Sequence, residues 1–165
     1  MKTGKTELFM TYSIRMLVFL AVFTMSPWAG ASERAELDLW KHDPFMYGMC
    51  GHCGDFITFH ENKNRAEFTE FSLYDQTGYY SVVLKGPAGT VVTLYGAMNF
   101  KKEKGYLILV KKDDALVQIE DLEAFPQDRW VDFSSGKEGK GGYSAFFKPY
   151  PNFKNNIASI QWEKK

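Results

Sequence analysis

Residues 89–111 read GTVVTLYGAMNFKKEKGYLILVK, and their pattern indicates the kind of fold. β-Branched, aliphatic and aromatic residues fill Val91–Tyr95 and Tyr106–Val110, a composition and spacing typical of strands. Between them lies a polar segment that begins at Gly96 and ends at Gly105, and glycine favours turns. The stretch therefore predicts two strands joined by a loop.

The same pattern continues on both sides of this stretch. Helix is expected only at Ser32–Lys41, where Leu37 and Trp40 would share one side, and as a single turn at Glu120–Phe125. Strands at this spacing without intervening helices favour an all-β fold, an antiparallel Greek-key sandwich or barrel of roughly 7–9 strands. The other predicted strands are Asp55–His60, Glu67–Leu73, Tyr79–Leu84, Leu116–Glu120, Trp130–Phe133, Tyr143–Phe147 and Ile157–Trp162.

The N-terminus has the layout of a secretory signal. An apolar run, Met16–Met25, follows several basic residues and precedes the small-residue segment Ala29–Ala31. The run is shorter than the roughly 20 apolar residues that a membrane-spanning helix needs. We therefore expect a signal peptide at 1–31 and a single β domain at 32–165, periplasmic or secreted and without a membrane span.

The charge balance limits the classes of partner. The whole chain has 20 basic and 20 acidic residues, and removing the predicted signal leaves 17 basic and 19 acidic, a net charge of −2. Nucleic-acid binding needs a basic face that replaces counterions, so this balance argues against nucleic acid. It also argues against electrostatic attachment to a membrane.

The segment Gly89–Phe100 resembles the opening of a βγ-crystallin Greek-key motif. Such motifs place two aromatic residues with four residues between them and a Gly nearby; Tyr95 and Phe100 have this spacing, and Lys102 stands at the position of the Gly. Residues 57–62 are similar to the start of a second such motif, with His60 at the first aromatic position. Arg65, just after this range, stands at the second aromatic position. Residues 155–160 are similar to the final strand of that family. The resemblance implies a Greek-key β fold.

The resemblance does not extend to the calcium site of that family. Its signature requires a hydroxyl where Ala158 falls, and an acidic or amide side chain where Lys154 falls. We therefore expect no bound metal and no cofactor.

The two cysteines form the motif Cys50-Gly51-His52-Cys53. Outside the cytoplasm paired cysteines tend to oxidise, which favours a structural disulfide between Cys50 and Cys53. Closing so short a loop removes little chain entropy, so its stabilisation would be on the order of 2 kcal/mol or less.

Two alternatives for this motif stay open. The tetrapeptide is similar to the active site of protein disulfide isomerases, but that chemistry needs a helix after the first cysteine, and residues 54–59 predict a strand. Zinc ligation would use both cysteines, His60 and either His42 or His52, although strong zinc signatures carry a second spaced pair.

Catalytic motifs are scarce. The chain has no G-x-S-x-G sequence, and its three histidines all lie between His42 and His60. Glu120, Asp128 and Asp132 could in principle place two carboxylates together, but surface carboxylates are usually only solvated. We expect a protein that is not an enzyme.

Binding to another protein is the function that these observations favour. The loop 96–105 places Met98 and Phe100 in a polar, basic setting, although Phe100 could equally turn into the core. Trp130, beside Asp128 and Asp132, is a second candidate, and the Gly-rich loop 134–142 is the most flexible segment expected. The predicted contact residues are Met98, Asn99, Phe100, Lys101, Trp130, Lys137 and Glu138.

In size, export and disulfide the chain resembles periplasmic lysozyme inhibitors and bacterial immunity proteins. The resemblance implies a stoichiometric inhibitor that blocks a cell-wall-degrading enzyme or toxin. The alternatives are a βγ-crystallin-like structural or ligand-binding module, for a sugar or a metal ion, and a CxxC thiol oxidoreductase. The strand at Ile157–Trp162 could pair across the axis of a homodimer.

Overall fold

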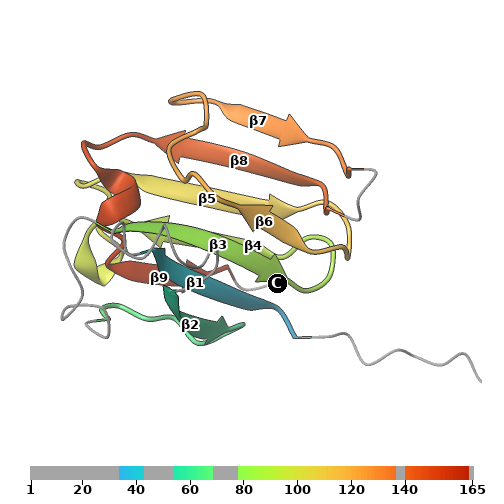
Figure 1. The fold of residues 1–165 in the computed structure, drawn as a ribbon, viewed down its shortest axis with the longest axis horizontal. Helices are drawn as coiled ribbons and strands as arrows, with labels where there is room; N and C mark the ends of the chain where they lie inside the picture. The colour runs from blue at the N-terminus through green and yellow to red at the C-terminus, as the bar shows by residue number, and fades with distance from the viewer. Residues whose placement is uncertain (1–33, 43–53, 69–77, 137–139, 164–165) are drawn as a thin grey trace, which may run out of the picture. The chain divides into compact units, whose positions relative to one another are not determined.

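The computed structural model describes residues 34–42, 54–68, 78–136 and 140–163. Within them the chain forms nine strands in two antiparallel sheets, so the predicted all-β antiparallel sandwich is confirmed (Figure 1). The orders are β2-β1-β3-β6 and β7-β8-β5-β4-β9. The strands are β1 (Glu36–His42), β2 (Gly54–His60), β3 (Tyr79–Lys85), β4 (Val91–Tyr95), β5 (Tyr106–Lys111), β6 (Val117–Ile119), β7 (Trp130–Phe133), β8 (Tyr143–Lys148) and β9 (Ser159–Trp162).

The helix predicted at Ser32–Lys41 is wrong, because Glu36–His42 forms strand β1 inside the four-stranded sheet. β1 pairs along its whole length with β2 on one side and β3 on the other. Leu37 lies in the core, whereas Trp40 stacks on the exposed Phe56 at a centroid distance of 4.5 Å. Pairing with two strands that are distant in the sequence overrides the local spacing on which the helix rested.

Two further expectations change at element boundaries. The described part of the strand predicted at Glu67–Leu73 has no strand pairing; Phe68 packs on Phe59 at 5.4 Å, and residues 69–73 lie outside the described residues. The segment predicted as one helical turn, Glu120–Phe125, is a turn in which the Ala124 N–H donates to the Asp121 carbonyl at 3.3 Å.

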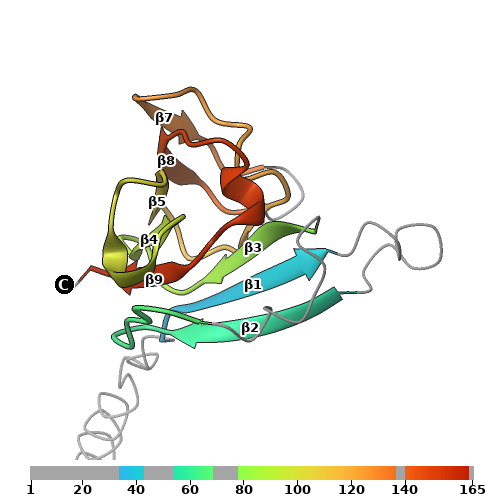
Figure 2. The ribbon, with the colours of Figure 1, turned by 90° about the vertical axis from the view of Figure 1, so that its left-hand side faces the viewer.

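The core lies between the two sheets, which Figure 2 shows as separate layers. Alternation decides which side chains enter it: along β5 every second residue is buried. Burying a Leu, Ile or Val side chain stabilises the fold by about 1.5–3 kcal/mol. Inward-facing residues include Leu37, Leu39, Val82 and Leu84 from the four-stranded sheet and Leu94, Leu107, Leu109 and Ile160 from the five-stranded sheet.

Lys111, at the end of β5, is also buried. Its side chain is 1% exposed, and its Nζ donates to the Leu84 carbonyl on β3 at 3.5 Å and to the Ala115 carbonyl. Loss of hydration lowers the pKa of the Lys111 ammonium. The side chain therefore joins the two sheets through a polar contact inside the core.

Lys41 makes a similar contact from β1. Its Nζ donates to the carbonyls of Gly78 and Asn155 and lies 4.1 Å from the centre of the Tyr80 ring. Burial raises the pKa of the Tyr80 phenol to about 12.

Candidate functional site

The outer face of the five-stranded sheet carries several aromatic side chains. Strand pleating turns Tyr106 and Ile108 outward, because their neighbours Leu107 and Leu109 are buried. The register places Phe146 opposite Ile108 on one side and opposite Trp130 on the other. Residues that face each other across strands share a face, so these side chains lie on one surface.

Five rings form a continuous series on this surface, which we call the aromatic row. It crosses β7, β8, β5 and β4, which lie side by side in Figure 1, and ends on the 3-10 helix η1 (Met98–Phe100). Each neighbouring pair of this kind contributes about 0.5–1.5 kcal/mol beyond its area burial. The centroid distances are 5.6 Å for Trp130–Phe146, 5.9 Å for Phe146–Tyr106, 6.2 Å for Tyr106–Tyr95 and 5.9 Å for Tyr95–Phe100.

Exposure differs along the aromatic row. Trp130, at one end, is 53% exposed, whereas Tyr95 is 5% exposed. Phe146, Tyr106 and Phe100 are half-buried. The row is therefore anchored at Tyr95 and most accessible at Trp130.

Ion pairs flank the aromatic row. The Lys148 Nζ lies 2.8 Å from Asp128 Oδ1, and the Lys112 Nζ lies 2.8 Å from Asp132 Oδ1. Hydrogen bonds from Lys112 and from Ser144 lower the pKa of Asp132, and the bond to Asp128 raises the pKa of Lys148. Both acidic residues near Trp130 are thus compensated, which leaves its surroundings without surplus negative charge.

The loop after β4 carries four of the predicted contact residues, and they differ in exposure. Met98 is 46% exposed, and Asn99 and Lys101 are also exposed, but Phe100 turns back against Tyr95. Backbone contacts hold the loop: the Asn99 N–H donates to the Ala66 carbonyl at 2.6 Å, and the Phe100 N–H donates to Ser159 Oγ at 3.1 Å.

Asn99 and Phe100 both have positive φ, 59° and 58°. This conformation is uncommon for a bulky residue and persists only where the surroundings fix it.

Of the predicted contact residues, Phe100 and Trp130 turn out to be the two ends of one row. Tyr95, Tyr106 and Phe146 connect them. The sequence singled out Tyr95 only for its motif spacing, and it missed Tyr106 and Phe146. The sequence signal for Tyr106 and Phe146 was their position in the alternating pattern of β5 and β8, where the neighbours on the strand are buried and these two residues face outward.

Several predicted site residues lie outside the described part of the chain: Cys50, His52, Cys53, Lys137 and Glu138. His60 is described and its Nδ1 lies 3.2 Å from Glu36 Oε1 on the surface of the four-stranded sheet. Among the described residues, no group of three His, Cys, Asp or Glu side chains is placed to hold a metal ion.

The described ends of the Gly-rich loop are anchored by Asp113. Its carboxylate accepts hydrogen bonds from the Gly142 N–H at 2.8 Å, from the Ala115 N–H at 3.0 Å and from the Ser135 hydroxyl. These bonds lower the pKa of Asp113, the one from Ser135 most. They fix both stems of the loop to the turn after β5.

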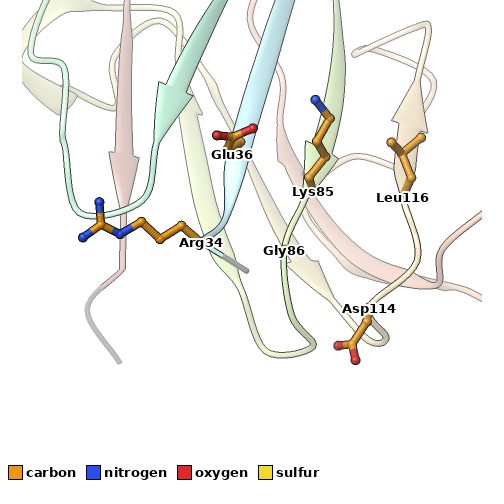
Figure 3. A pocket seen from close by; sticks show the side chains of 6 residues that line it. All are labelled: Arg34, Glu36, Lys85, Gly86, Asp114 and Leu116. Atoms are coloured by element: carbon orange, nitrogen blue, oxygen red, sulfur yellow. The ribbon is translucent and has the colours of Figure 1, made fainter. Parts of the chain in front are cut away.

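A pocket of about 380 Å³ opens at one end of β1 and β3 (Figure 3). Three of its four charged side chains already bond within the chain: Glu36 to His60, Lys85 to Asp38 at 2.9 Å, and Asp114 to the Ala88 N–H at 2.8 Å. Its two basic residues, Arg34 and Lys85, equal its two acidic ones in number, so the pocket offers no surplus of either charge to a ligand. Its lining residues are Arg34, Glu36, Lys85, Gly86, Asp114 and Leu116.

The dimer edge predicted at Ile157–Trp162 is already engaged within the chain where the structure describes it. The Ile160 N–H donates to the Arg65 carbonyl at 2.9 Å, and the Trp162 N–H donates to Asn64 Oδ1 at 2.8 Å. These donors would be needed to pair with a second copy.

Comparison with known proteins finds no match among family models, curated proteins or solved structures. In the described residues, no helix has the length and apolar character needed to cross a membrane.

Proposed function

We propose that this protein is an exported inhibitor that binds one protein partner, a cell-wall-degrading enzyme or toxin, through the aromatic row. It acts by occupying the substrate cleft of that partner and not by catalysis. The single observation that carries the proposal is the exposure of Trp130 at the end of a row that is otherwise half-buried or buried.

Trp130 has the properties of an interface anchor. Tryptophan is enriched at binding hot spots, because its large ring contributes much contact area with few rotatable bonds. Here the ring is backed by Phe146 on a paired strand, so little conformational freedom remains to be lost on binding. Truncation of such an anchor costs about 2–4 kcal/mol of binding free energy.

The other end of the row supplies a second group of contacts. Met98 adds exposed apolar area beside Phe100, and Lys101 adds a positive charge at the rim. An apolar centre with polar and charged neighbours is the usual anatomy of a protein interface.

The predicted signal sequence, with its basic start and its apolar run Met16–Met25, supports export of the protein.

The test begins with the chain as bait in an envelope extract of the source organism. A captured hydrolase or toxin is then purified, and its activity is followed as the loss of turbidity of a cell-wall suspension. We expect inhibition that saturates at one chain per enzyme. Trp130→Ala should weaken the complex about 30- to 1,000-fold, the range that corresponds to the anchor's free energy.

A matched control is Phe56→Ala on the other sheet. Phe56 is 51% exposed, so the control removes a ring of similar exposure from a different surface. Equal inhibition by wild type and Trp130→Ala would contradict the proposal, as would equal weakening by the two variants.

A further inference from the structure

A second concave surface lies beside the end of β8, and the proposed inhibitor function does not use it. It is an open groove of about 500 Å³, within the size range of small-molecule sites. Its lining residues are Glu123, Gln127, Phe147, Pro149, Tyr150, Pro151 and Asn152.

One wall of the groove is apolar and held in place. Tyr150 is 42% exposed and sits between Pro149 and Pro151, whose rings fix the backbone on either side. The Tyr150 carbonyl also accepts a hydrogen bond from the Phe153 N–H at 3.1 Å. The phenol ring therefore projects from a stiff segment.

Behind Tyr150 the chain leaves little space. A Cβ at Gly105 would lie 2.9 Å from the Cβ of Tyr150 and 2.7 Å from the Lys148 carbonyl oxygen. Only a glycine lets the two segments approach so closely without displacement. The position of Tyr150 is thus set by the β4–β5 hairpin end as well as by its own prolines.

The rim of the groove carries polar groups with fixed backbones. The Asn152 carbonyl accepts hydrogen bonds from the Asn155 N–H at 3.0 Å and from Asn156 Nδ2 at 2.7 Å. Gln127 forms an isolated bridge with Phe147, next to the bond from the Asp128 N–H to the Phe147 carbonyl at 2.9 Å.

Glu123 completes the rim. One of its oxygens, Oε1, accepts a hydrogen bond from the Lys154 N–H at 3.2 Å, which orients the carboxylate. With Gln127 and Asn152 it offers two amides and one carboxylate beside an exposed aromatic ring.

This combination selects the chemistry of the ligand. None of the described lining residues is Lys or Arg, and the one charge among them is negative, so a phosphate or carboxylate ligand would be repelled. Amide and carboxylate groups pair with hydroxyl groups as donors and acceptors. The face of an aromatic ring is electronegative and packs against slightly positive C–H groups.

We propose that the groove binds neutral sugar units, with a pyranose ring packed on Tyr150 and its hydroxyls bonded to Glu123, Gln127 and Asn152. The site is open, so each unit keeps part of its hydration and binds weakly. A dissociation constant on the order of 1 mM is expected, because one pyranose unit of about 12 heavy atoms at about 0.3 kcal/mol per atom gives about 4 kcal/mol of binding free energy.

The experiment uses the full chain and three neutral probes: N-acetylglucosamine tetramer, cellotetraose and maltotetraose. Titration is followed by ¹H–¹⁵N chemical-shift changes and by calorimetry. We expect at least one probe to shift signals of residues 123–128 and 147–152. Tyr150→Ala should weaken that binding at least ten-fold, and Tyr150→Phe, which keeps the ring, should weaken it less than three-fold.

Phe56→Ala again serves as the control and should leave the binding unchanged. Glucose 6-phosphate is the anionic comparison and should bind more weakly than the neutral probes. The proposal is overturned if no probe shifts these signals, if Tyr150→Ala binds like wild type, or if the anionic sugar binds best. None of these results depends on the aromatic row, so the inhibitor proposal stands or fails separately.

Discussion

Replacement of Lys111 tests whether a polar contact inside the core joins the two sheets. The side chain is 1% exposed and its Nζ donates to carbonyls of Leu84 and Ala115. In Lys111→Ala, about three buried methylenes are lost at about 0.8 kcal/mol each, and two carbonyls lose a charged donor. The substitution also removes the cost of desolvating the buried ammonium. We therefore expect the free energy of unfolding to fall by about 3–4 kcal/mol in total.

Lys111→Met separates the two contributions. Methionine keeps most of the apolar stem but cannot donate a hydrogen bond. The change in the free energy of unfolding should then come from the two unsatisfied carbonyls, partly offset by removal of the buried charge. We expect a loss of about 1–2 kcal/mol.

The pH dependence of stability gives an independent measurement. Burial lowers the pKa of Lys111 in the folded chain below its usual 10.5. At pH values between the lowered pKa of the folded chain and 10.5, the unfolded chain therefore holds a proton that the folded chain lacks. Stability of the wild type should therefore rise with pH relative to Lys111→Met as pH 10.5 is approached.

Urea unfolding followed by tryptophan fluorescence and far-UV circular dichroism measures these differences. The control is Lys112→Ala on the next residue, which removes an exposed ion pair to Asp132 and should cost less than about 1 kcal/mol. If Lys111→Ala is no more destabilising than Lys112→Ala, the buried contact does not join the sheets as described.

Two other perturbations test local features. Gly96→Ala would place a Cβ 2.1 Å from the Lys104 carbonyl oxygen, so the hairpin must shift; we expect a loss of about 2 kcal/mol or more in urea unfolding. The control Gly136→Ala, whose Cβ would meet the nearest atom at 3.6 Å, should change stability far less, and similar losses would refute the contact. For Tyr80, the pKa of the folded chain is raised from 10.0 to about 12, so the folded state keeps a proton that the unfolded state loses. Stability should fall between pH 10 and pH 12, and Tyr80→Phe should flatten that fall; an unchanged slope would place the titration elsewhere.

The strands that the sequence located are those whose signal is local. β5 is the clearest case, because its strand-forming residues are bounded by Gly105 on one side and by the polar segment after Lys111 on the other. β1 was missed because Leu37 and Trp40 have a spacing that also fits a helix, and only β2 and β3 show that the segment is extended.

The candidate site was located only in part. Phe100 and Trp130 were chosen from the sequence as separate candidates, one on a loop and one on a strand. The sequence also left open whether each was core or contact. The structure connects them through Phe146, Tyr106 and Tyr95. It places Phe100 half-buried but Trp130 largely exposed.

The residue pattern alone indicates that the chain is built mainly of antiparallel strands, and which side chains along a strand share a face. Both follow from backbone pleating and residue type, which act over a few residues. The packing of the two sheets sets which of the two faces is covered. It also decided that Lys111 is buried, that Trp130 is exposed and that Tyr150 faces a groove. Those outcomes depend on strands that meet from distant parts of the chain, and alternation is identical whichever face the other sheet covers.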